Sequence, residues 1–260
     1  MEAGGYAFGE ERGRESERLA AVQQAFDGPT RLALGEAGLR AGWRCWEVGA
    51  GLGSIARWLA EAVGPRGRVL ATDLDDRCFG DAGATGNLEF RAHDLTSDPG
   101  RADEFDLVHA RFVLEHLPGP EAVIARLARA LRPGGVLVLE DSAGLDFAVE
   151  PPTDALAGLA PRWERAGASV GWSAAYGRAL IGDLRAAGLR DLRGFEYRRH
   201  APGGVSWEHV VSGLERLQPE LLEAGVSEAE LGQATACLRD CTRQITGPPV
   251  LIAWGRARPD

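Results

Sequence analysis

The residues with the clearest chemical signature form one glycine-rich segment, Glu47-Val48-Gly49-Ala50-Gly51-Leu52-Gly53-Ser54. A short apolar run precedes this segment and a helical pattern follows it, so we expect a strand, a tight loop and a helix. Glycine lets the backbone approach a ligand without a side chain in the way, and a helix amino terminus presents free N–H groups. The segment therefore predicts a loop that binds a nucleotide-like ligand, with a purely structural turn as the alternative.

The spacing of the glycines restricts the class of ligand. Gly53 stands two positions after Gly51, whereas the dinucleotide-binding pattern places the third glycine three positions after the second. The chain also contains no lysine, and so no Tyr-x-x-x-Lys pair. Both features disfavour a NAD-dependent oxidoreductase, which remains the alternative from a different class of protein.

The glycine-rich segment resembles motif I of the class I S-adenosylmethionine-dependent methyltransferases. Further stretches resemble this family in the same order: Asp73, 20 positions beyond Gly53 (73 − 53), then His93-Asp94-Leu95, Phe105–Leu117 and Leu131–Gly135. Together they cover about residues 40–141. The resemblance implies S-adenosylmethionine as the cofactor, bound by Tyr6, Glu47, Gly49, Ala50, Gly51, Gly53, Asp73, Leu74, Asp94, Leu95 and Arg111.

For three of these residues the resemblance implies a specific role at the cofactor, but a purely structural role is also open. Asp73 would accept hydrogen bonds from the ribose hydroxyls, but it is also a suitable helix N-cap. Asp94 would face the adenine amine, but it could simply begin an Asx turn. Arg111 would shape the methionine end of the cofactor site or cap the sheet.

The same resemblance implies transfer of a methyl group to an oxygen, nitrogen or carbon atom of a small-molecule metabolite, of the kind made in bacterial secondary metabolism. Such a transfer is an in-line displacement at an activated carbon, so the protein mainly has to hold the reactants close together in a dry pocket. A protein of the same fold that binds the cofactor without methylating anything is a second alternative.

Two residues are candidates for catalysis. His116 could act as a general base, because an imidazole titrates near neutral pH, or it could only shape the cofactor site. Asp141 follows the expected fifth strand, where it could orient an amine or take a proton, or remain a solvated loop carboxylate. No metal site is expected, because Cys237 and Cys241 lack the further ligands that a zinc site needs.

Other polar and aromatic residues lie where a substrate pocket could open. Trp163, Trp172 and Tyr176 could wall an aromatic substrate or pack within their own insertion. Tyr197 and His200 lie near the end of the expected sixth strand, although a surface position is the more common outcome for such a histidine.

The elements that position these residues follow from the hydrophobic pattern. We expect an α/β fold with a doubly wound, mostly parallel seven-stranded sheet, a helical amino-terminal cap and helical insertions. An irregular stretch is expected over residues 142–175 and a mostly helical one over 207–243. Helices are expected at about 6–27, 30–37, 54–63, 120–131 and 178–187, and strands at 44–48, 68–73, 88–92, 105–110, 136–140, 192–198 and 249–254.

This pattern indicates one methyltransferase-like domain over residues 1–260. It would consist of a helical cap (1–40), a cofactor-binding core (41–141) and the substrate-side insertions with the last strands (142–260). The segment from Tyr6 to Phe26 is charged and amphipathic, so we expect it either to close over the cofactor as a lid or to pack permanently on the flank of the sheet.

The composition limits the partners. A net charge of −9 gives no electrostatic footprint for nucleic acid or for an anionic membrane, so we expect a small-molecule substrate. No leader and no stretch of about 20 apolar residues is present, so a cytoplasmic protein is expected. All 29 basic residues are arginine, which is typical of a GC-rich bacterial genome. The pattern leaves the oligomeric state open.

Overall fold

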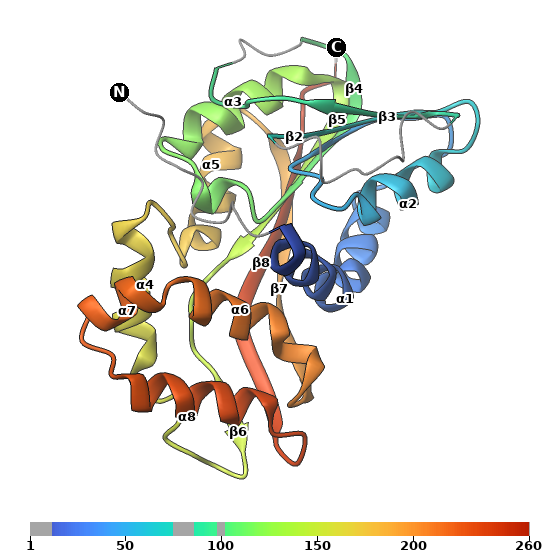
Figure 1. Ribbon diagram of the computed structural model, residues 1–260. Helices are drawn as coiled ribbons and strands as arrows, with labels where there is room; N and C mark the ends of the chain where they lie inside the picture. Colours follow the sequence, from blue (N-terminus) through green and yellow to red (C-terminus); the bar gives the residue numbers. More distant parts are fainter. Residues whose placement is uncertain (1–11, 75–85, 98–101, 260) are drawn as a thin grey trace.

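The computed structural model describes residues 12–74, 86–97 and 102–259 and shows a central sheet with helices on both faces (Figure 1). Five parallel strands are ordered β3-β2-β1-β4-β5. Strand β8 pairs antiparallel to β5, and β7 pairs antiparallel to β8. The expected doubly wound, mostly parallel α/β fold is confirmed. The seven long strands are β1 Arg44–Val48, β2 Arg68–Asp73, β3 Leu88–Ala92, β4 Phe105–Arg111, β5 Leu131–Ser142, β7 Arg190–Pro202 and β8 Gln244–Arg256.

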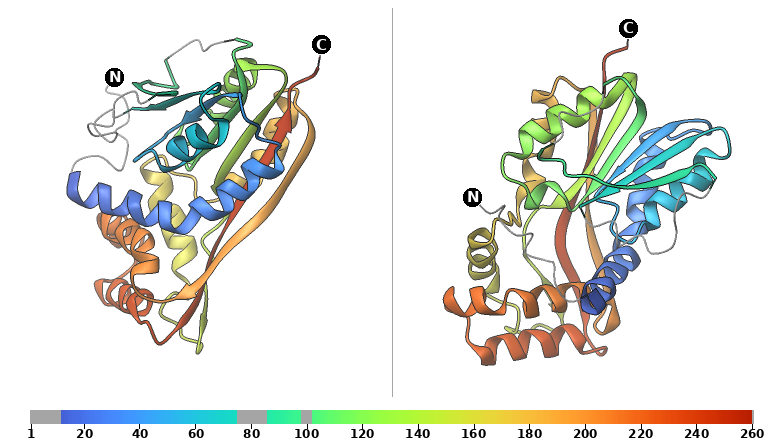
Figure 2. Two further views of the ribbon diagram at one scale, coloured as in Figure 1. Left: turned by 90° about the vertical axis from the view of Figure 1, so that its right-hand side faces the viewer. Right: turned by 45° about the horizontal axis from the view of Figure 1, so that its top comes forward.

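The sheet gains an eighth strand that the sequence pattern did not indicate. The short strand β6, Ala148–Glu150, pairs with the first residues of β8. Strands β7 and β8 are also longer than expected, because β8 continues through Pro248 and Pro249, where we expected the strand to begin. Their extra length forms a two-stranded ribbon that runs out of the main sheet towards the carboxyl-terminal helices (Figure 2).

The alternating side chains of the strands explain why both faces carry helices. On β5, Val136 and Val138 pack in the cluster that includes α1 (Arg12–Glu36) and α2 (Ser54–Val63). The residue that separates them, Leu137, packs in the opposite cluster with α3 (Pro120–Ala130) and α5 (Leu180–Ala186). Strands that are buried on both faces are the expected form of a parallel sheet.

The amino-terminal cap is one helix, not the two that the sequence pattern suggested. We placed a break at Gly28-Pro29, but α1 runs through Pro29. Proline has no N–H to bond the carbonyl of Ala25, four residues earlier. Arg199 of β7 donates to this carbonyl from Nη1 at 3.3 Å, and the Tyr197 hydroxyl lies at 3.5 Å from it. Strand β7 thus replaces the hydrogen bond that proline removes, and the helix continues.

A second layer of helices covers the ribbon and has a core of its own. It consists of α4 (Leu159–Ser169), α6 (Glu208–Arg216), α7 (Gln218–Glu223) and α8 (Glu228–Arg239). The mostly helical 207–243 region is confirmed, whereas the irregular 142–175 region is wrong, because it contains β6 and α4. Leu159, Trp163 and Ala166 of α4 are buried at helical spacing. Among the described residues, no helix has the length and apolar character needed to cross a membrane.

Candidate active site

A cavity of about 900 Å³ opens at the carboxyl ends of β1 to β4. This edge is where ligands bind in open α/β sheets. The loops that follow these four strands form its floor. Helix α1 contributes Leu19, Val22 and Phe26 to the opposite wall, and α6 contributes His209 and Val210. The lining residues therefore place the cavity between the parallel sheet, the amino-terminal helix and the carboxyl-terminal helical layer. Figure 2 shows how these three parts are arranged.

Two glycines of the loop after β1 serve different purposes. Gly49 and Gly51 both have positive φ angles, +65° and +52°, which side chains rarely adopt. A Cβ on Gly49 would lie 2.3 Å from Cγ2 of Val113, so this glycine lets the loop pack against the segment after β4. A Cβ on Gly51 would meet only Leu19, at 3.5 Å. Gly51 is thus the position where a missing side chain leaves space on the cavity side.

The two aspartates expected at the cofactor site both line the cavity. Asp73 accepts a hydrogen bond from the Gly51 N–H at Oδ2, at 2.8 Å, so the carboxylate is fixed to the glycine loop. Asp94 begins an Asx turn, because its Oδ1 accepts bonds from the N–H and the hydroxyl of Thr96, both at 2.7 Å. These bonds lower the pKa of Asp94. Both carboxylates are held in place at the sheet edge.

The remaining residues of the expected cofactor set divide between the cavity wall and its support. Ala50, Leu74, Leu95 and Arg111 line the cavity with the residues described above. Gly53 does not line it; a Cβ there would lie 2.9 Å from the Phe90 ring, so this glycine serves packing. Glu47 is also absent from the wall and lies buried below it. Tyr6 lies outside the described residues.

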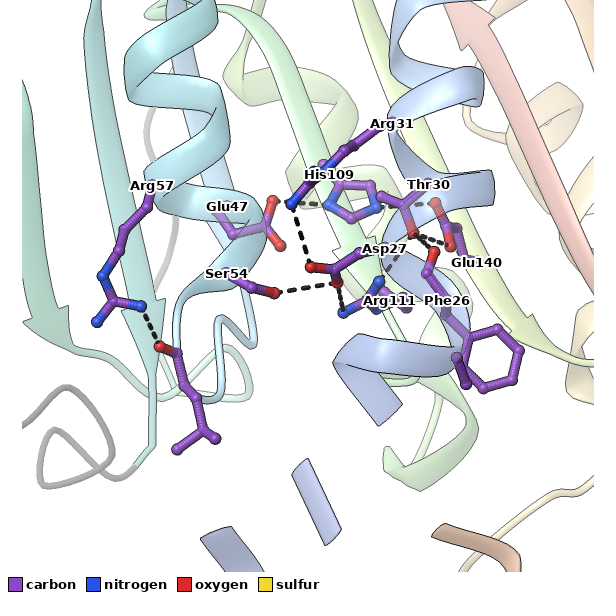
Figure 3. Close-up of polar contacts among 12 residues, drawn as sticks. Phe26, Asp27, Thr30, Arg31, Glu47, Ser54, Arg57, His109, Arg111 and Glu140 are labelled. Carbon is purple, nitrogen blue, oxygen red and sulfur yellow. Dashed lines mark hydrogen bonds and ion pairs between the residues drawn. The ribbon is translucent and has the colours of Figure 1, made fainter. Parts of the chain in front are cut away.

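Glu47 belongs to a buried polar network that joins the sheet to α1 (Figure 3). Its Oε2 lies 2.6 Å from Nδ1 of His109, and Nε2 of His109 lies 3.2 Å from Glu140 Oε1. The other oxygen of Glu140 accepts from the Thr30 hydroxyl of α1, at 2.9 Å. Burial alone would lower the pKa of His109, but the charges and hydrogen bonds of Glu47 and Glu140 raise it to about 9. His109 is therefore an imidazolium held between two carboxylates at neutral pH.

Arg111 extends this network to the cavity wall. Its Nη1 donates to the Thr30 hydroxyl at 2.9 Å, and its Nη2 lies 3.1 Å from Asp27 Oδ1. The same oxygen of Asp27 accepts from the Ser54 hydroxyl at the start of α2, at 3.0 Å (Figure 3). Residues 27–30 of α1 are thus bound to β4, β5 and α2 directly beneath the glycine loop.

The first turns of α1 are held over the cavity by a separate ion-pair cluster. Glu15 pairs with Arg18 of the same helix at 2.7 Å and with Arg216 of α6. Burial raises the pKa of Glu15, but the two arginines outweigh that effect and lower it. This cluster connects the amino-terminal helix to the carboxyl-terminal helical layer across the cavity.

The structure places the two candidate catalytic residues differently. His116 lines the cavity, and burial together with the charge of Arg18 lowers its pKa to about 3. It is therefore a neutral imidazole and a weak base. Asp141 is 1% exposed and does not line the cavity. Burial and the neighbouring Glu115 raise its pKa well above the usual range.

Several aromatic side chains from the segments after β5 line the cavity. Trp163 and Trp172, for which the sequence left packing within the insertion as the alternative, line it together with Phe147 and Trp207. The Phe147 and Trp163 rings stack with centroids 6.3 Å apart. Tyr176 does not line the cavity; its hydroxyl donates to Asp183 at 2.7 Å.

Two residues near the end of the expected sixth strand also lie outside the cavity wall. The Tyr197 hydroxyl lies near the Ala25 carbonyl, and His200 is exposed with its Nδ1 2.9 Å from the Thr246 hydroxyl. His200 thus takes the surface position that is common for such a residue.

Sequence reasoning missed several residues of the wall. Glu115 lines the cavity and is 5% exposed, but from the sequence we chose the neighbouring His116 as the candidate catalytic residue. Arg18 and Leu19 also line the cavity; they belong to the amphipathic amino-terminal segment that was expected to close over the cofactor or to pack on the flank of the sheet. His209 carries no local signal, because the packing of α6 against α1, where its ring meets Phe26 with centroids 5.6 Å apart, brings it to the cavity.

Comparison with known proteins gives consistent results. Residues 46–137 match the family described as "Methyltransferase domain". The ubiquinone/menaquinone biosynthesis C-methyltransferase UbiE of Pseudomonas putida is 32% identical over 120 residues, which are 43% of this chain and 47% of that protein. The chain therefore spans about half the length of the curated relatives that it matches.

Solved structures show the same fold at low identity. A methyltransferase-like protein from Bacillus halodurans is 19% identical, with a TM-score of 0.59 over 88% of this chain and 98% of that one. Phosphoethanolamine N-methyltransferase 2 of Haemonchus contortus, solved with S-adenosylhomocysteine and phosphomonomethylethanolamine, is 15% identical. Its TM-score is 0.55 over 94% of this chain and 52% of that one.

Proposed function

We propose that this chain, which belongs to the class I S-adenosylmethionine-dependent methyltransferases, transfers a methyl group from S-adenosylmethionine to a small molecule held in the cavity. The observation that carries the proposal is the pairing of the glycine loop with Asp73 at the cavity wall, through the 2.8 Å bond from the Gly51 N–H. A flexible or solvated aspartate would need no such bond, whereas a carboxylate that binds a ribose must be fixed in place.

The residues at this edge fit the cofactor. Gly51 leaves space on the cavity side, and Asp73 beside it offers carboxylate oxygens for a pair of hydroxyls. Asp94, whose position is fixed by its Asx turn, offers an acceptor for an amine. We assign the nucleoside to Ala50, Gly51, Asp73, Leu74, Asp94 and Leu95, and the methionine end to Gly49 and Arg111. Glu47 and Gly53 support the loop from behind.

When bound, the cofactor supplies an activated methyl carbon on a sulfonium. The chain's own residues then have to orient the acceptor and exclude water. The aromatic wall of Phe147, Trp163 and Trp207 can hold an apolar body, and α1 contributes Leu19 to the cavity wall. We propose that His116, as a neutral imidazole at the wall, helps to orient the reactants. Asp141, enclosed behind the wall, acts on the site through Glu115.

The experiment is a methylation screen with S-adenosylmethionine labelled in its methyl group, applied to a panel of bacterial metabolites. We expect label to appear in at least one panel compound and the Asp73→Ala variant to lose most of this transfer. The exposed Asp154→Ala variant should retain wild-type transfer, because Asp154 lies outside the cavity wall. Transfer that is equal in the wild-type protein and the folded Asp73→Ala variant would contradict the proposed site.

A further inference from the structure

A buried pair of carboxyl groups lies at the cavity, and the cofactor assignment does not use it. Glu115 is in the turn after β4 (Leu114–His116), is 5% exposed and lines the cavity. Asp141, near the end of β5, lies behind Glu115 and is 1% exposed. Asp141 Oδ1 accepts from the Glu115 N–H at 3.4 Å, so the two residues are in direct contact.

The hydrogen bonds place the negative charge on Glu115. Its Oε2 accepts from the Ser142 N–H at 2.8 Å, and the Ser142 side chain also lowers the pKa of Glu115. The hydrogen bond that Asp141 Oδ1 accepts is longer, 3.4 Å from the Glu115 N–H, although the Val113 backbone also lowers the pKa of Asp141. Its Oδ2 has no hydrogen-bond partner among the described residues. A carboxylate is stabilised by the donors that point at it, so a shared proton resides on Asp141.

Charged groups on the neighbouring elements agree with this assignment. Arg18 of α1 lowers the pKa of Glu115, whereas Glu140 of β5 raises the pKa of Asp141. Burial raises the pKa of both carboxyl groups, so Glu115 is a stronger base than an exposed glutamate. His116, whose Nε2 lies 3.6 Å from Glu115 Oε1, does not compete for the proton because its own pKa is about 3.

The surroundings of Glu115 indicate what it would meet. The cavity that Glu115 lines is also lined by Phe147, Trp163, Trp172 and Trp207, which suit a flat apolar body. In such surroundings a buried carboxylate is costly unless a ligand supplies a hydrogen-bond donor. A ligand with an apolar body and one hydrogen-bond donor would fit both the aromatic lining and the Glu115 carboxylate.

On the basis of the proposed function, we propose that Glu115 binds the acceptor group of the substrate, an O–H or N–H on an aromatic or alicyclic body, and receives its proton during methyl transfer. The O–H or N–H bond breaks as the bond from oxygen or nitrogen to the methyl carbon forms. The proton goes to a carboxylate oxygen of Glu115, and the electron pair of the broken carbon–sulfur bond stays on sulfur. Glu115 is thus assigned as a catalytic residue that also selects protic acceptors.

The test measures binding rather than turnover. Protein saturated with S-adenosylhomocysteine is titrated calorimetrically with 2-naphthol, 2-naphthylmethylamine and 2-methoxynaphthalene, which share one apolar body. We expect the alcohol, the amine or both to bind about tenfold more tightly than the methyl ether, which has no donor for Glu115. Tighter binding of the alcohol indicates an oxygen acceptor, and tighter binding of the amine indicates a nitrogen acceptor.

Two matched variants distinguish the effect of the Glu115 carboxylate on ligand binding from the effect of the cavity's shape. Glu115→Gln keeps the side-chain size, and its carbonyl can still accept from Ser142, so S-adenosylhomocysteine affinity should be unchanged while the preference over the methyl ether disappears. Glu121→Gln, at an exposed position of α3, should keep the preference. If Glu115→Gln fails to fold, the order of the three ligand affinities in the wild-type protein still tests the proposal.

Two results would overturn the assignment: a methyl ether that binds the wild-type protein as tightly as both donors, or a donor preference that survives in Glu115→Gln. If S-adenosylhomocysteine binds in either case, only the role of Glu115 fails. If S-adenosylhomocysteine does not bind at all, the proposed function fails and this assignment fails with it.

Discussion

Removing the buried charge of His109 should make the stability of the protein depend differently on pH. His109 is fully buried between Glu47 and Glu140, and no solvent can replace its two contacts. In the His109→Gln variant the two carboxylates remain buried without an opposing charge at that position. We expect the variant to lose about 3–5 kcal/mol of unfolding free energy at pH 6, the usual cost of breaking a buried ion pair.

The pH dependence follows from the pKa of the same residue. Burial lowers this pKa, but the carboxylates of Glu47 and Glu140 raise it from 6.5 to about 9 in the folded protein. Because the folded value is the higher one, the stabilisation is complete below about pH 6.5 and is lost as the pH rises to about 9. This rise in pKa corresponds to at most about 3 kcal/mol of unfolding free energy.

The assay is urea unfolding between pH 6 and pH 9.5. The wild-type free energy of unfolding should fall across this range by up to about 3 kcal/mol more than that of His109→Gln. His200→Gln is the matched control, since His200 is exposed, and it should follow the wild-type curve. Parallel curves for the wild type and His109→Gln would refute the interpretation of His109 as a buried imidazolium.

Three further predictions concern the cofactor edge and the amino-terminal helix. Asp73→Ala should weaken S-adenosylhomocysteine binding by about 1–3 kcal/mol in calorimetry, the cost of leaving hydroxyls without their acceptor; equal affinity in a folded variant would remove Asp73 from the site. Gly49→Ala should destabilise the protein by about 1–3 kcal/mol in urea unfolding, because the new Cβ meets Val113 at a positive φ; an unchanged midpoint would show that the loop relaxes freely. Glu15→Gln should increase amide exchange over residues 15–24, because it weakens the pairs with Arg18 and Arg216, and S-adenosylhomocysteine should restore part of the protection. Exchange that is the same with and without the ligand would mean that this part of α1 is not a ligand-coupled lid.

The parts of the fold that repeat a local pattern could be predicted from the sequence. Strands β1 to β3 and helix α2 have the expected bounds. For β1, β2 and α2 the reason is local, because each apolar run ends at glycine, proline or an acidic residue. The break expected at Pro29 was wrong because Arg199, 170 positions later (199 − 29), supplies a donor to the carbonyl that proline leaves free. Local propensity does not contain such a contact.

Only part of the candidate site could be predicted from the sequence, for the same reason. The glycine loop, Asp73 and Asp94 follow strands, so the sequence could place them at one edge of the sheet. The second half of the cavity depends on how α4 and α6 pack on the ribbon of β7 and β8, and this packing decides that Trp163 faces the cavity while Tyr176 does not. Glu47 was expected among the cofactor-binding residues but lies buried below the cavity wall, because its partner His109 comes from another strand of the sheet.

The central claim is that the cavity beside Gly51 and Asp73 binds S-adenosylmethionine. Isothermal titration of the full chain with S-adenosylhomocysteine and, in parallel, with reduced NAD tests it most directly. We predict that S-adenosylhomocysteine binds at one site per chain, that Asp73→Ala weakens this binding, and that reduced NAD gives no heat of binding. Saturable binding of reduced NAD without any binding of S-adenosylhomocysteine would contradict the claim.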